Sequence, residues 1–560
     1  MTRRIRFGVW MVALVAALAL QAPGAAAQSG GASSIQPAEL EGWLSRLASD
    51  DFEGRATFTE GLGLAASYIA DHLKTWGVEP AGDHGTYFQR VAVLGVDSTN
   101  HSTVTVTVNG TSKTFADGEG VTFPKNVGGK QVLTGDEVVF AGYGFSAPPL
   151  DFNDYSDVDA AGKVVVWIGA TGPAAADPQT YRRLLAGRNR FAVDDRHAIA
   201  AIGEAAPPSA NGPGGGARPG AQPAADFTTV QRLDQPTPPS LTASDAFFEF
   251  LFSASGTPYA ELKAKAAKGE PLPHFALKGV TIRFNIDADY EVVRTQYTRN
   301  VVGIVRGTDP LLKDTYVAFG AHYDHVGYAE TAVEVGKRAG APGTVKEAND
   351  RIWNGADDDG SGTVTVMAIA KAFAEGPKPK RSLLFVWHAG EERGLLGSRY
   401  YADHPTVPMD AIVAQLNIDM VGRNSEDDPA QSNTVLLVGS DRISTELHNL
   451  SEDANQSLDP PLTLDYAMND PADLEQVYYR SDHYSYAAKG VPIIFYTTGL
   501  HPDYHANSDE VDKIEFGKMA RIARLVYVTG DRVANLDHAP ARDNKGPRVG
   551  KGSHGKLPPK

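Results

Sequence analysis

Residues 316–325 read YVAFGAHYDH, an apolar run that gives way at once to His322, Asp324 and His325. An unbroken apolar run of this kind is typical of a β-strand that is buried on both faces, as in a parallel sheet. A charged side chain at the end of such a strand needs a partner, because burying it alone is costly. The stretch therefore predicts a buried strand at 316–319 that ends in a polar cluster.

Three more apolar runs have the same character, at residues 383–387, 412–418 and 493–496. Between the first two of the four strands, the apolar side chains of residues 362–375 recur at helical spacing and predict an amphipathic helix. Alternating strands and helices are characteristic of an α/β domain. We therefore expect residues 291–533 to form an α/β domain whose mainly parallel sheet is flanked by helices.

Polar residues follow the other strands as well, namely Glu391 and Glu392, then Asp419, then His505, and a run of three Asp at 357–359 precedes the helix. Each cluster alone has an ordinary explanation. An Asp run before a helix is commonly an N-terminal cap, and a Glu pair is commonly a solvated turn. Ligands of open α/β sheets bind beyond the carboxyl ends of the strands, so the clusters together predict one shared site.

Composition limits the chemistry of that site. The chain has 560 residues, no cysteine and a formal net charge of −16. Without cysteine there can be no disulfide, thiol nucleophile or sulfur ligand, so a metal must be held by nitrogen and oxygen. The folded part of the sequence contains no basic stripe, which argues against a nucleic-acid partner. Imidazole and carboxylate ligands suit zinc, cobalt or manganese, and a two-metal hydrolytic site needs a bridging carboxylate and a nearby base.

The first 27 residues predict a signal peptide. Arg3, Arg4 and Arg6 precede an apolar run, and three alanines at 25–27 form a small-residue cleavage pattern. The apolar run is short for a membrane span. We therefore expect export to the periplasm or the medium, with cleavage after Ala27 and no stable membrane anchor in the mature chain.

Five motifs occur in order: Gly-Ala-His-Tyr-Asp at 320–324, Asp-Asp-Gly-Ser-Gly at 358–362, Gly-Glu-Glu at 390–392, Asn-Ile-Asp-Met at 417–420 and Tyr-His at 504–505. In this order they resemble the M28 peptidases, a family of zinc aminopeptidases. The resemblance covers about residues 298–530 and reaches Asp-Phe-Glu-Gly-Arg near the N-terminus. It implies a zinc-aminopeptidase-like fold and two Zn²⁺ per chain, with Co²⁺ or Mn²⁺ as alternatives.

The resemblance also implies the metal ligands. His322 and Asp419 would hold one zinc ion, Glu392 and His505 would hold the other, and Asp358 would bridge the two.

Further roles follow from the same resemblance. Asp357 is a rival to Asp358 as the bridge, although the motif favours Asp358. Glu391 would be the general base. Asp324 would orient His322 by accepting its second ring N–H. His325 is expected to be solvated or to support a ligand rather than to bind metal.

Two residues are predicted to bind substrate. Tyr504, next to a ligand, could donate a hydrogen bond to the oxyanion, or it could be a packed aromatic ring. Arg480 opens an Arg-Ser-Asp-His motif, in which the family's Arg contacts the polar main chain of the substrate. A structural Arg–carboxylate pair is the competing interpretation of Arg480.

Residues 131–290 are rich in strand-like runs and resemble a protease-associated (PA) domain. The likeness rests on Phe-Ala-Gly-Tyr-Gly at 140–144, Asp-Tyr at 154–155 and Gly-Lys-Val-Val-Val at 162–166. Such domains lie beside the active site as a lid or substrate rim. We therefore expect a β-rich PA-like domain inserted into the peptidase domain.

The remaining boundaries follow from composition. Residues 28–130 would form the N-terminal part of the peptidase domain. Residues 205–224, rich in Ala, Pro and Gly, predict a low-complexity loop, and residues 534–560 predict a disordered basic tail.

Together, the residues and the resemblance predict an exported metal-dependent peptidase. The favoured activity is that of an aminopeptidase that hydrolyses N-terminal residues from peptides with a water activated by two zinc ions. A carboxypeptidase, a glutaminyl-cyclase-like member of the same fold with one zinc, and a catalytically dead binding or receptor-like protein remain alternatives. A dead protein would have lost ligands, whereas all five expected ligands are present. Side-chain specificity and oligomeric state are not set by the sequence.

Overall fold

A computed structural model describes residues 31–205, 224–337 and 341–546 of the chain. The predicted signal peptide, almost all of the predicted low-complexity loop and the last part of the predicted tail lie outside the described residues. Within the described ranges, no helix combines the length and the apolarity that a membrane crossing requires.

The first of two large sheets carries the four strands expected from the sequence. In spatial order its strands are β12 (Phe227–Thr229), β2 (Phe88–Asn100), β16 (Ala288–Val305), β20 (Ser382–His388), β17 (Tyr316–His322), β21 (Ile412–Ile418), β24 (Ile493–Thr497), β22 (Thr434–Val438) and β23 (Thr463–Asp465), and β1 (Glu79–Pro80) pairs with β16.

This sheet is parallel in its centre and at the β22–β23 edge, and it is antiparallel elsewhere. β20, β17, β21 and β24 are mutually parallel, whereas β16 joins β20 and β22 joins β24 in antiparallel fashion. Every residue of β17, β20 and β21 is buried, as expected for strands covered on both faces. The α/β class predicted from the sequence is confirmed, and the antiparallel flanks are the departure from it.

Helices cover both faces of the first sheet. One face carries α1 (Pro37–Leu47), α2 (Glu60–Thr75), α7 (Gly362–Glu375), α9 (Thr445–Gln456) and α11 (Phe516–Asn535), and the other carries α8 (Leu396–Asp403) and α10 (His483–Ala487). Phe319 shows how the sequence selects these faces, because its ring stacks on Phe385 at 5.1 Å and meets Phe373 of α7 at 5.9 Å. Its neighbour Ala318 packs on the opposite face.

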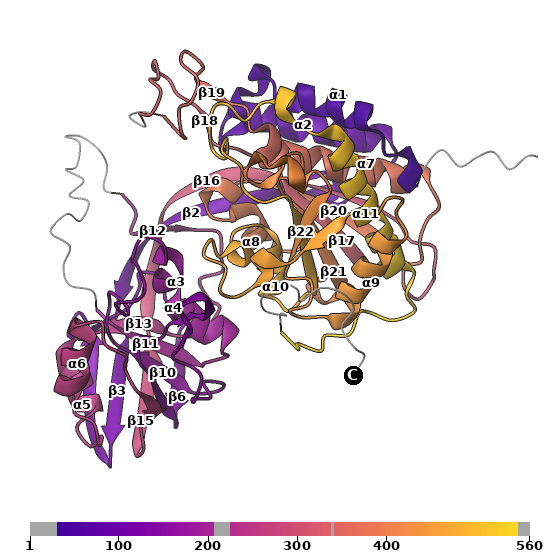
Figure 1. Ribbon diagram of the computed structural model, residues 1–560. Coiled ribbons are helices and arrows are strands. Elements are labelled where there is room, and N and C mark those ends of the chain that lie inside the picture. The colour runs from indigo at the N-terminus through magenta and orange to yellow at the C-terminus, as the bar shows by residue number, and fades with distance from the viewer. Residues whose placement is uncertain (1–30, 206–223, 338–340, 547–560) are drawn as a thin grey trace, which may run out of the picture.

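A second sheet forms a separate lobe (Figure 1), with its own apolar core. Its strands, in spatial order, are β14 (His274–Ala276), β7 (Val138–Ala141), β10 (Val164–Trp167), β11 (Ala200–Glu204), β13 (Ser240–Ala243), β5 (Gly120–Thr122), β4 (Thr111–Asp117), β3 (Thr103–Val108), β15 (Val280–Ile286) and β6 (Gln131–Gly135). The described part of this lobe includes the short α-helices α3 (Arg182–Ala186), α4 (Arg188–Arg190), α5 (Asp245–Leu251) and α6 (Tyr259–Ala267).

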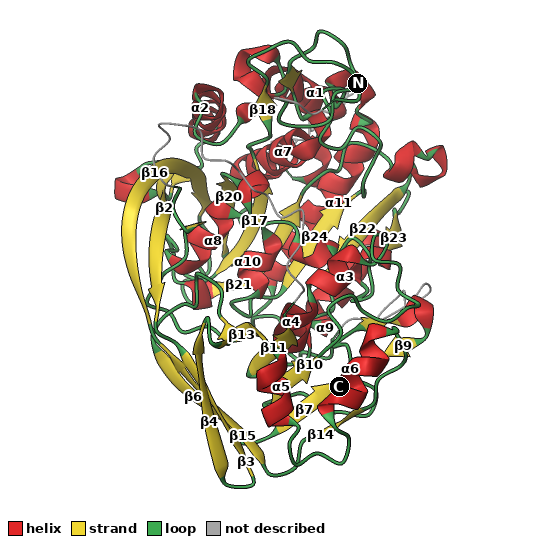
Figure 2. Ribbon diagram, turned by 90° about the vertical axis from the view of Figure 1, so that its left-hand side faces the viewer, coloured by secondary structure: helices red, strands yellow, loops and turns green. Residues whose placement is uncertain are grey.

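The inserted lobe begins earlier than predicted. β2 and β16 pair along almost their whole length and run from the first sheet toward the second (Figure 2). β3, β4 and β5, which precede residue 131, belong to the second sheet. The boundary therefore lies near residue 101 rather than 131. The alternating run of β3 fits a strand of either sheet, so only its pairing with β15 assigns it.

The predicted tail also begins too early. Residues 534 and 535 are the last residues of α11. Beyond them, the backbone N–H of Asn544 donates to the carbonyl of Ile443, and the N–H of Thr445 donates to the carboxylate of Asp543. The segment 536–546 therefore packs against the region that leads into α9, despite its polar composition.

Candidate active site

The predicted metal ligands come from five different segments and meet at the carboxyl edge of the parallel strands. His322 ends β17, Glu392 follows β20, Asp419 follows β21, His505 lies in the loop after β24, and Asp358 lies in the turn before α7. Parallel strands bring residues far apart in sequence to one edge.

These side chains form two groups that share one carboxylate. In the first group, Nε2 of His322 lies 3.3 Å from Oδ1 of Asp358 and 3.6 Å from Oδ1 of Asp419. In the second group, Nε2 of His505 lies 3.1 Å from Oδ2 of Asp358 and 3.0 Å from Oε2 of Glu392. Asp358 thus presents one oxygen to each group.

Unpaired buried atoms show that these residues fit metal ions. Oδ2 of Asp358 and Oε1 of Glu392 are buried and accept no well-directed hydrogen bond from the described residues, although imidazole nitrogens lie 3.1 and 2.9 Å from them. Such oxygens are costly unless a hydrogen-bond donor or a cation satisfies them. The nitrogen and oxygen donors suit a divalent transition metal such as zinc. A cation in each group would satisfy these atoms.

The structure separates Asp358 from its rival Asp357. The carboxylate of Asp357 accepts a hydrogen bond from the N–H of Gly422 at 2.6 Å and lies 3.2 Å from Nε2 of His501. It is therefore directed away from the two groups. Asp509, which sequence reasoning missed, accepts hydrogen bonds from the N–H groups of both Asp357 and Asp358.

Asp359, the third acid of the run, fastens three segments together. Its carboxylate accepts hydrogen bonds from the backbone N–H groups of His322, Gly362 and Met420, at 3.2, 2.9 and 3.1 Å. The hydrogen bond from Gly362, at the start of α7, is the one expected of an N-terminal cap. The other two bonds join β17, the start of α7 and the end of β21, so Asp359 fixes the backbone beside two predicted ligands.

Glu391, the predicted base, faces the first group. Its Oε2 lies 4.0 Å from Nε2 of His322. Burial raises the pKa of the Glu391 carboxyl well above its usual value; His322 opposes this effect, and the carboxylates of Glu392 and Asp419 add to it. A base with a pKa nearer to neutrality is better matched to proton transfer in water at ordinary pH.

Asp324 lies beside His322, but not quite as predicted. Nδ1 of His322 lies 3.1 Å from the backbone carbonyl oxygen of Asp324 and 3.7 Å from its Oδ1. The carboxylate instead accepts hydrogen bonds from the N–H of Glu391 and the hydroxyl of Thr57, both at 3.1 Å. The backbone carbonyl is thus the nearer acceptor for the ring, and the carboxylate holds the turn that carries Glu391.

His325 is closer to the site than the sequence indicated. Its side chain is fully buried, and Nδ1 lies 2.9 Å from Oε1 of Glu392 and 3.8 Å from Oδ2 of Asp358. Neither ring nitrogen makes a well-directed hydrogen bond with the described residues. The expectation of a solvated ring is therefore wrong, and His325 joins Asp358 and Glu392 as a group able to hold a metal. Its position directly after Asp324, in the same cluster, was the available signal.

Both predicted substrate residues line a small cavity of about 50 Å³ beside the first group. Arg480 donates to the carboxylate of Glu475 at 2.8 Å and to the hydroxyl of Tyr504 at 3.2 Å. The Tyr504 ring stacks on His505, with centroids 4.0 Å apart. The structural ion pair and the contact with the site therefore coexist at Arg480.

A hydroxyl from the same sequence motif holds one ligand. Ser481, next to Arg480, donates a hydrogen bond to Oδ2 of Asp419 at 2.7 Å, and it lines the same cavity. The Arg-Ser-Asp-His motif was the signal that could have identified it.

Comparisons with known proteins agree with this geometry. Residues 300–529 match the family described as Peptidase family M28. A probable leucine aminopeptidase of Trichophyton verrucosum (strain HKI 0517) is 29% identical over 231 residues, which cover 40% of this chain and 55% of the relative. A probable zinc metalloprotease of Phaeosphaeria nodorum is 31% identical over 130 residues, covering 23% of this chain and 25% of the relative. The chain thus spans about half the length, or less, of these curated relatives.

Among solved structures, the aminopeptidase from Aneurinibacillus sp. strain AM-1 is 18% identical, with a TM-score of 0.44 over 94% of this chain and 100% of the other. The sequence match and the two ligand groups coincide in the same segment, because every predicted ligand lies between residues 300 and 529. Residues 300–529 of this chain, which hold both ligand groups, therefore form a segment that matches peptidase family M28.

Proposed function

We propose that this protein is an exported aminopeptidase that uses two zinc ions and prefers apolar N-terminal residues. The observation that carries the proposal is the position of Asp358, whose two oxygens lie 3.3 Å from His322 and 3.1 Å from His505. A carboxylate shared by two imidazole-containing groups is what a bridged two-metal hydrolase requires. The predicted signal peptide supports export.

Two zinc ions at these positions would supply Lewis-acid activation of water and of the scissile carbonyl. Glu391 is placed to accept the proton of the attacking water and to return it to the leaving amine. Tyr504 can donate a hydrogen bond to the developing oxyanion. Burial raises the pKa of the Tyr504 hydroxyl well above its usual value, and the carboxylates of Asp358 and Glu392 raise it further, so the hydroxyl keeps its proton.

The cavity beside the metals favours an apolar side chain. Its apolar lining residues are Met420, Met468, Val477, Phe495 and Leu500. Apolar pockets gain affinity from each buried methylene group and reject charged groups that they cannot pair. Leucine and methionine are therefore the expected preferences over lysine or glutamate.

The charge around the cavity favours an N-terminal over a C-terminal substrate group. A C-terminal carboxylate would need an available cation, and Arg480 is the arginine that lines this cavity. Its guanidinium is already paired with Glu475 at 2.8 Å. The carboxylates of Glu391, Asp358 and Asp419 line the same cavity and would attract an amine instead.

A substrate panel tests the proposal. Leucine, lysine and glutamate amides with free amines, their N-acetylated forms, and peptides that differ only at the C-terminus are supplied to the purified mature protein, with and without a chelator. We expect hydrolysis of free-amine leucine amide, loss of activity with the chelator, recovery with zinc, and about two zinc ions per chain by elemental analysis.

Each alternative gives a different result. Turnover of N-blocked peptides from the C-terminus would indicate a carboxypeptidase. Full activity with one zinc ion per chain and cyclisation of N-terminal glutamine would indicate a cyclase. Zinc binding with no turnover of any substrate would indicate a binding protein.

A further inference from the structure

A short 3₁₀ turn separates the active-site cavity from the inserted lobe. This turn (η12, Val477–Tyr479) follows Gln476 and leads into Arg480. Because a 3₁₀ helix has three residues per turn, residues 477 and 480 share one face, and 478 and 479 lie on the others. Val477 and Arg480 accordingly line the active-site cavity, whereas Tyr478 and Tyr479 line a second cavity.

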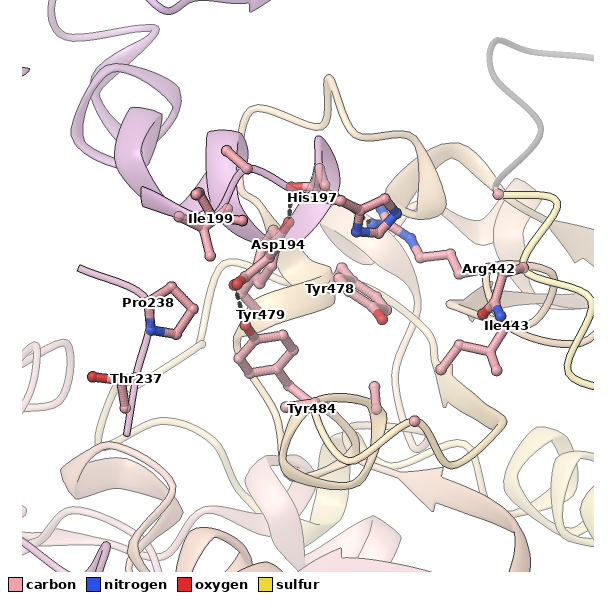
Figure 3. A pocket seen from close by; sticks show the side chains of 18 of the residues that line it. Asp194, His197, Ile199, Thr237, Pro238, Arg442, Ile443, Tyr478, Tyr479 and Tyr484 are labelled. Carbon is pink, nitrogen blue, oxygen red and sulfur yellow. Dashed lines mark hydrogen bonds and ion pairs between the residues drawn. The ribbon is translucent and has the colours of Figure 1, made fainter. Parts of the chain in front are cut away.

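This second cavity, of about 740 Å³, lies between the inserted lobe and the first domain, which is the domain built on the first sheet (Figure 3). Its lobe side includes Asp194, Asp195 and His197, and its other side includes Tyr478, Tyr479 and Tyr484. Since protein atoms do not fill this space, packing alone does not fix the outer side of the turn. Contacts within its own domain hold the inner side of the turn, where Asp473 accepts a hydrogen bond from the N–H of Val477 at 2.8 Å. Polar contacts across the domain boundary hold its outer side.

The strongest of these contacts converge on Tyr479. Its hydroxyl donates a hydrogen bond to the carboxylate of Asp195, which also lies 3.3 Å from Nη1 of Arg442 in a mostly buried ion pair. The guanidinium of Arg190 lies 3.7 Å from the centre of the Tyr479 ring. Asp195 and Arg190 belong to the inserted lobe, so the lobe contacts the outer side of the turn through a hydrogen bond and a cation–π interaction.

A second line of contacts reaches Arg480 itself. Nε of Arg183, in α3 of the inserted lobe, lies 3.0 Å from Oε2 of Glu475, and the same oxygen accepts a hydrogen bond from Arg480 at 2.8 Å. Arg480 in turn donates to Tyr504, which stacks on His505. The contacts therefore run without a break from the lobe to a predicted metal ligand.

We infer that Asp195 of the inserted lobe is a positioning residue for substrate binding, because its hydrogen bond to Tyr479 sets the turn that places Val477 and Arg480 in the wall of the active-site cavity. The inference rests on the proposed function for its kinetic consequence, but not for its structural one. Arg183 has a smaller share, since its ion pair with Glu475 is about 40% exposed on each side chain and is screened by water.

The test removes single groups from this contact in the full-length mature protein. Tyr479→Phe deletes only the hydroxyl, and Asp195→Ala deletes the acceptor, whereas Asp195→Asn keeps an acceptor for Tyr479. Tyr484→Phe is the matched control, because it removes an equivalent hydrogen bond to Asp194 across the same boundary but outside the turn.

We expect Tyr479→Phe and Asp195→Ala to raise KM for leucine amide about three- to tenfold, with kcat changed less than about twofold. Asp195→Asn should recover much of the loss, and Tyr484→Phe should stay close to the parent protein. Zinc content should be unchanged in all four variants. Amide hydrogen exchange in residues 475–480 should be faster in Tyr479→Phe and Asp195→Ala only.

Separate results identify each failure. If KM and exchange in 475–480 are unchanged in Tyr479→Phe and Asp195→Ala, or if Tyr484→Phe has the same effects, the inference is overturned. Faster exchange with an unchanged KM overturns the role in substrate binding. If the parent protein hydrolyses no aminoacyl amide, the proposed function fails, and exchange in 475–480 alone decides whether the lobe positions the turn.

Discussion

Glu391 and Glu392 are adjacent in the chain but meet different neighbours. Glu392 places its oxygens 3.0 Å from His505 and 2.9 Å from His325, within the second ligand group. Glu391 lies on the side of the first group, 4.0 Å from His322, and lines the cavity. The short turn after β20 therefore gives the two carboxylates separate tasks.

Conservative substitution should separate these tasks. Glu391→Gln keeps shape and polarity but cannot accept a proton, so we expect kcat to fall by roughly 10²- to 10⁴-fold while zinc content and KM change little. Glu392→Gln should instead lose zinc. Steady-state kinetics with elemental analysis check both. Zinc loss from Glu391→Gln with retention in Glu392→Gln would exchange the two assignments.

His325 gives a second prediction at this scale. Both of its nitrogens are buried next to Glu392 and Asp358, and neither makes a well-directed hydrogen bond with the described residues. His325→Leu should therefore weaken zinc retention by about tenfold or more, whether measured by dialysis or by competition with a chelator. His404→Leu, a substitution of an exposed histidine outside the site, serves as the control. Equal zinc affinity in both variants would show that His325 only fills space.

At the scale of elements, one loop carries both Tyr504 and His505, and Asp503 anchors it. The Asp503 carboxylate lies 3.0 Å from Lys513, 3.2 Å from Arg423 and 3.3 Å from Lys346. Three cations from three different segments thus fasten the loop beside the second ligand group.

Asp503→Asn should loosen this loop. The neutral amide leaves the nearly buried Arg423 without one of its counter-charges, so we expect a loss of about 1–3 kcal/mol in stability and weaker zinc binding. Chemical denaturation and zinc titration of the variant measure these effects. Asp428→Asn, at an exposed N-cap, is a suitable control. Unchanged zinc affinity in Asp503→Asn would show that the loop is held by its backbone.

A turn in the inserted lobe gives a prediction about pH. Asp154 accepts hydrogen bonds from the N–H groups of Tyr143 and Phe145 at 2.9 and 3.1 Å. Burial raises the pKa of Asp154 to about 7, against the lowering effect of these hydrogen bonds and of Arg188. Protonation of Asp154 is therefore more favourable in the folded lobe than in the unfolded chain.

The sign of the effect follows from linkage. A folded-state pKa above the unfolded value of about 4 gives stability that is complete below pH 4 and lost as pH rises through about 7. Asp154→Asn should remove this dependence, which amounts to about 2–4 kcal/mol. Denaturation of the lobe at pH 5 and pH 8 tests it. An equally steep pH dependence in the variant would assign the effect to another group.

On the scale of the whole molecule, the site concentrates negative charge where five segments of the first domain meet. Asp358, Glu391, Glu392 and Asp419 are close together and largely buried. Their mutual repulsion opposes folding unless cations offset it. Metal binding should therefore stabilise the domain as well as the reaction.

Removal of metal should consequently lower the melting temperature. A ligand that binds only the folded state stabilises it by about 4 kcal/mol at a thousand times its Kd. We expect the Tm of the first domain to fall by several degrees in chelator and to recover with zinc, measured by calorimetry. The Asp358→Asn variant should show a smaller fall. The same Tm with and without chelator would mean that the site does not bind metal strongly.

Local sequence patterns determined much of this protein. The apolar runs that became β17, β20, β21 and β24, and the periodicity of α7, depend on burial and spacing over a few residues, which a sequence displays directly. Because parallel strands end at a common edge, the same runs also predicted that His322, Glu392 and Asp419 would meet.

Only the tertiary structure decided the rest. The alternating residues of β3 suit either sheet, so the lobe boundary depended on long-range pairing with β15. The contact of His325 with Glu392 and the hydrogen bond of Tyr479 to Asp195 likewise join segments that are far apart in the sequence. The backbone carbonyl of Asp324 is nearer to the His322 ring than the Asp324 carboxylate is, by only a few tenths of an ångström. Such contacts arise when the chain closes on itself, and no local pattern records them.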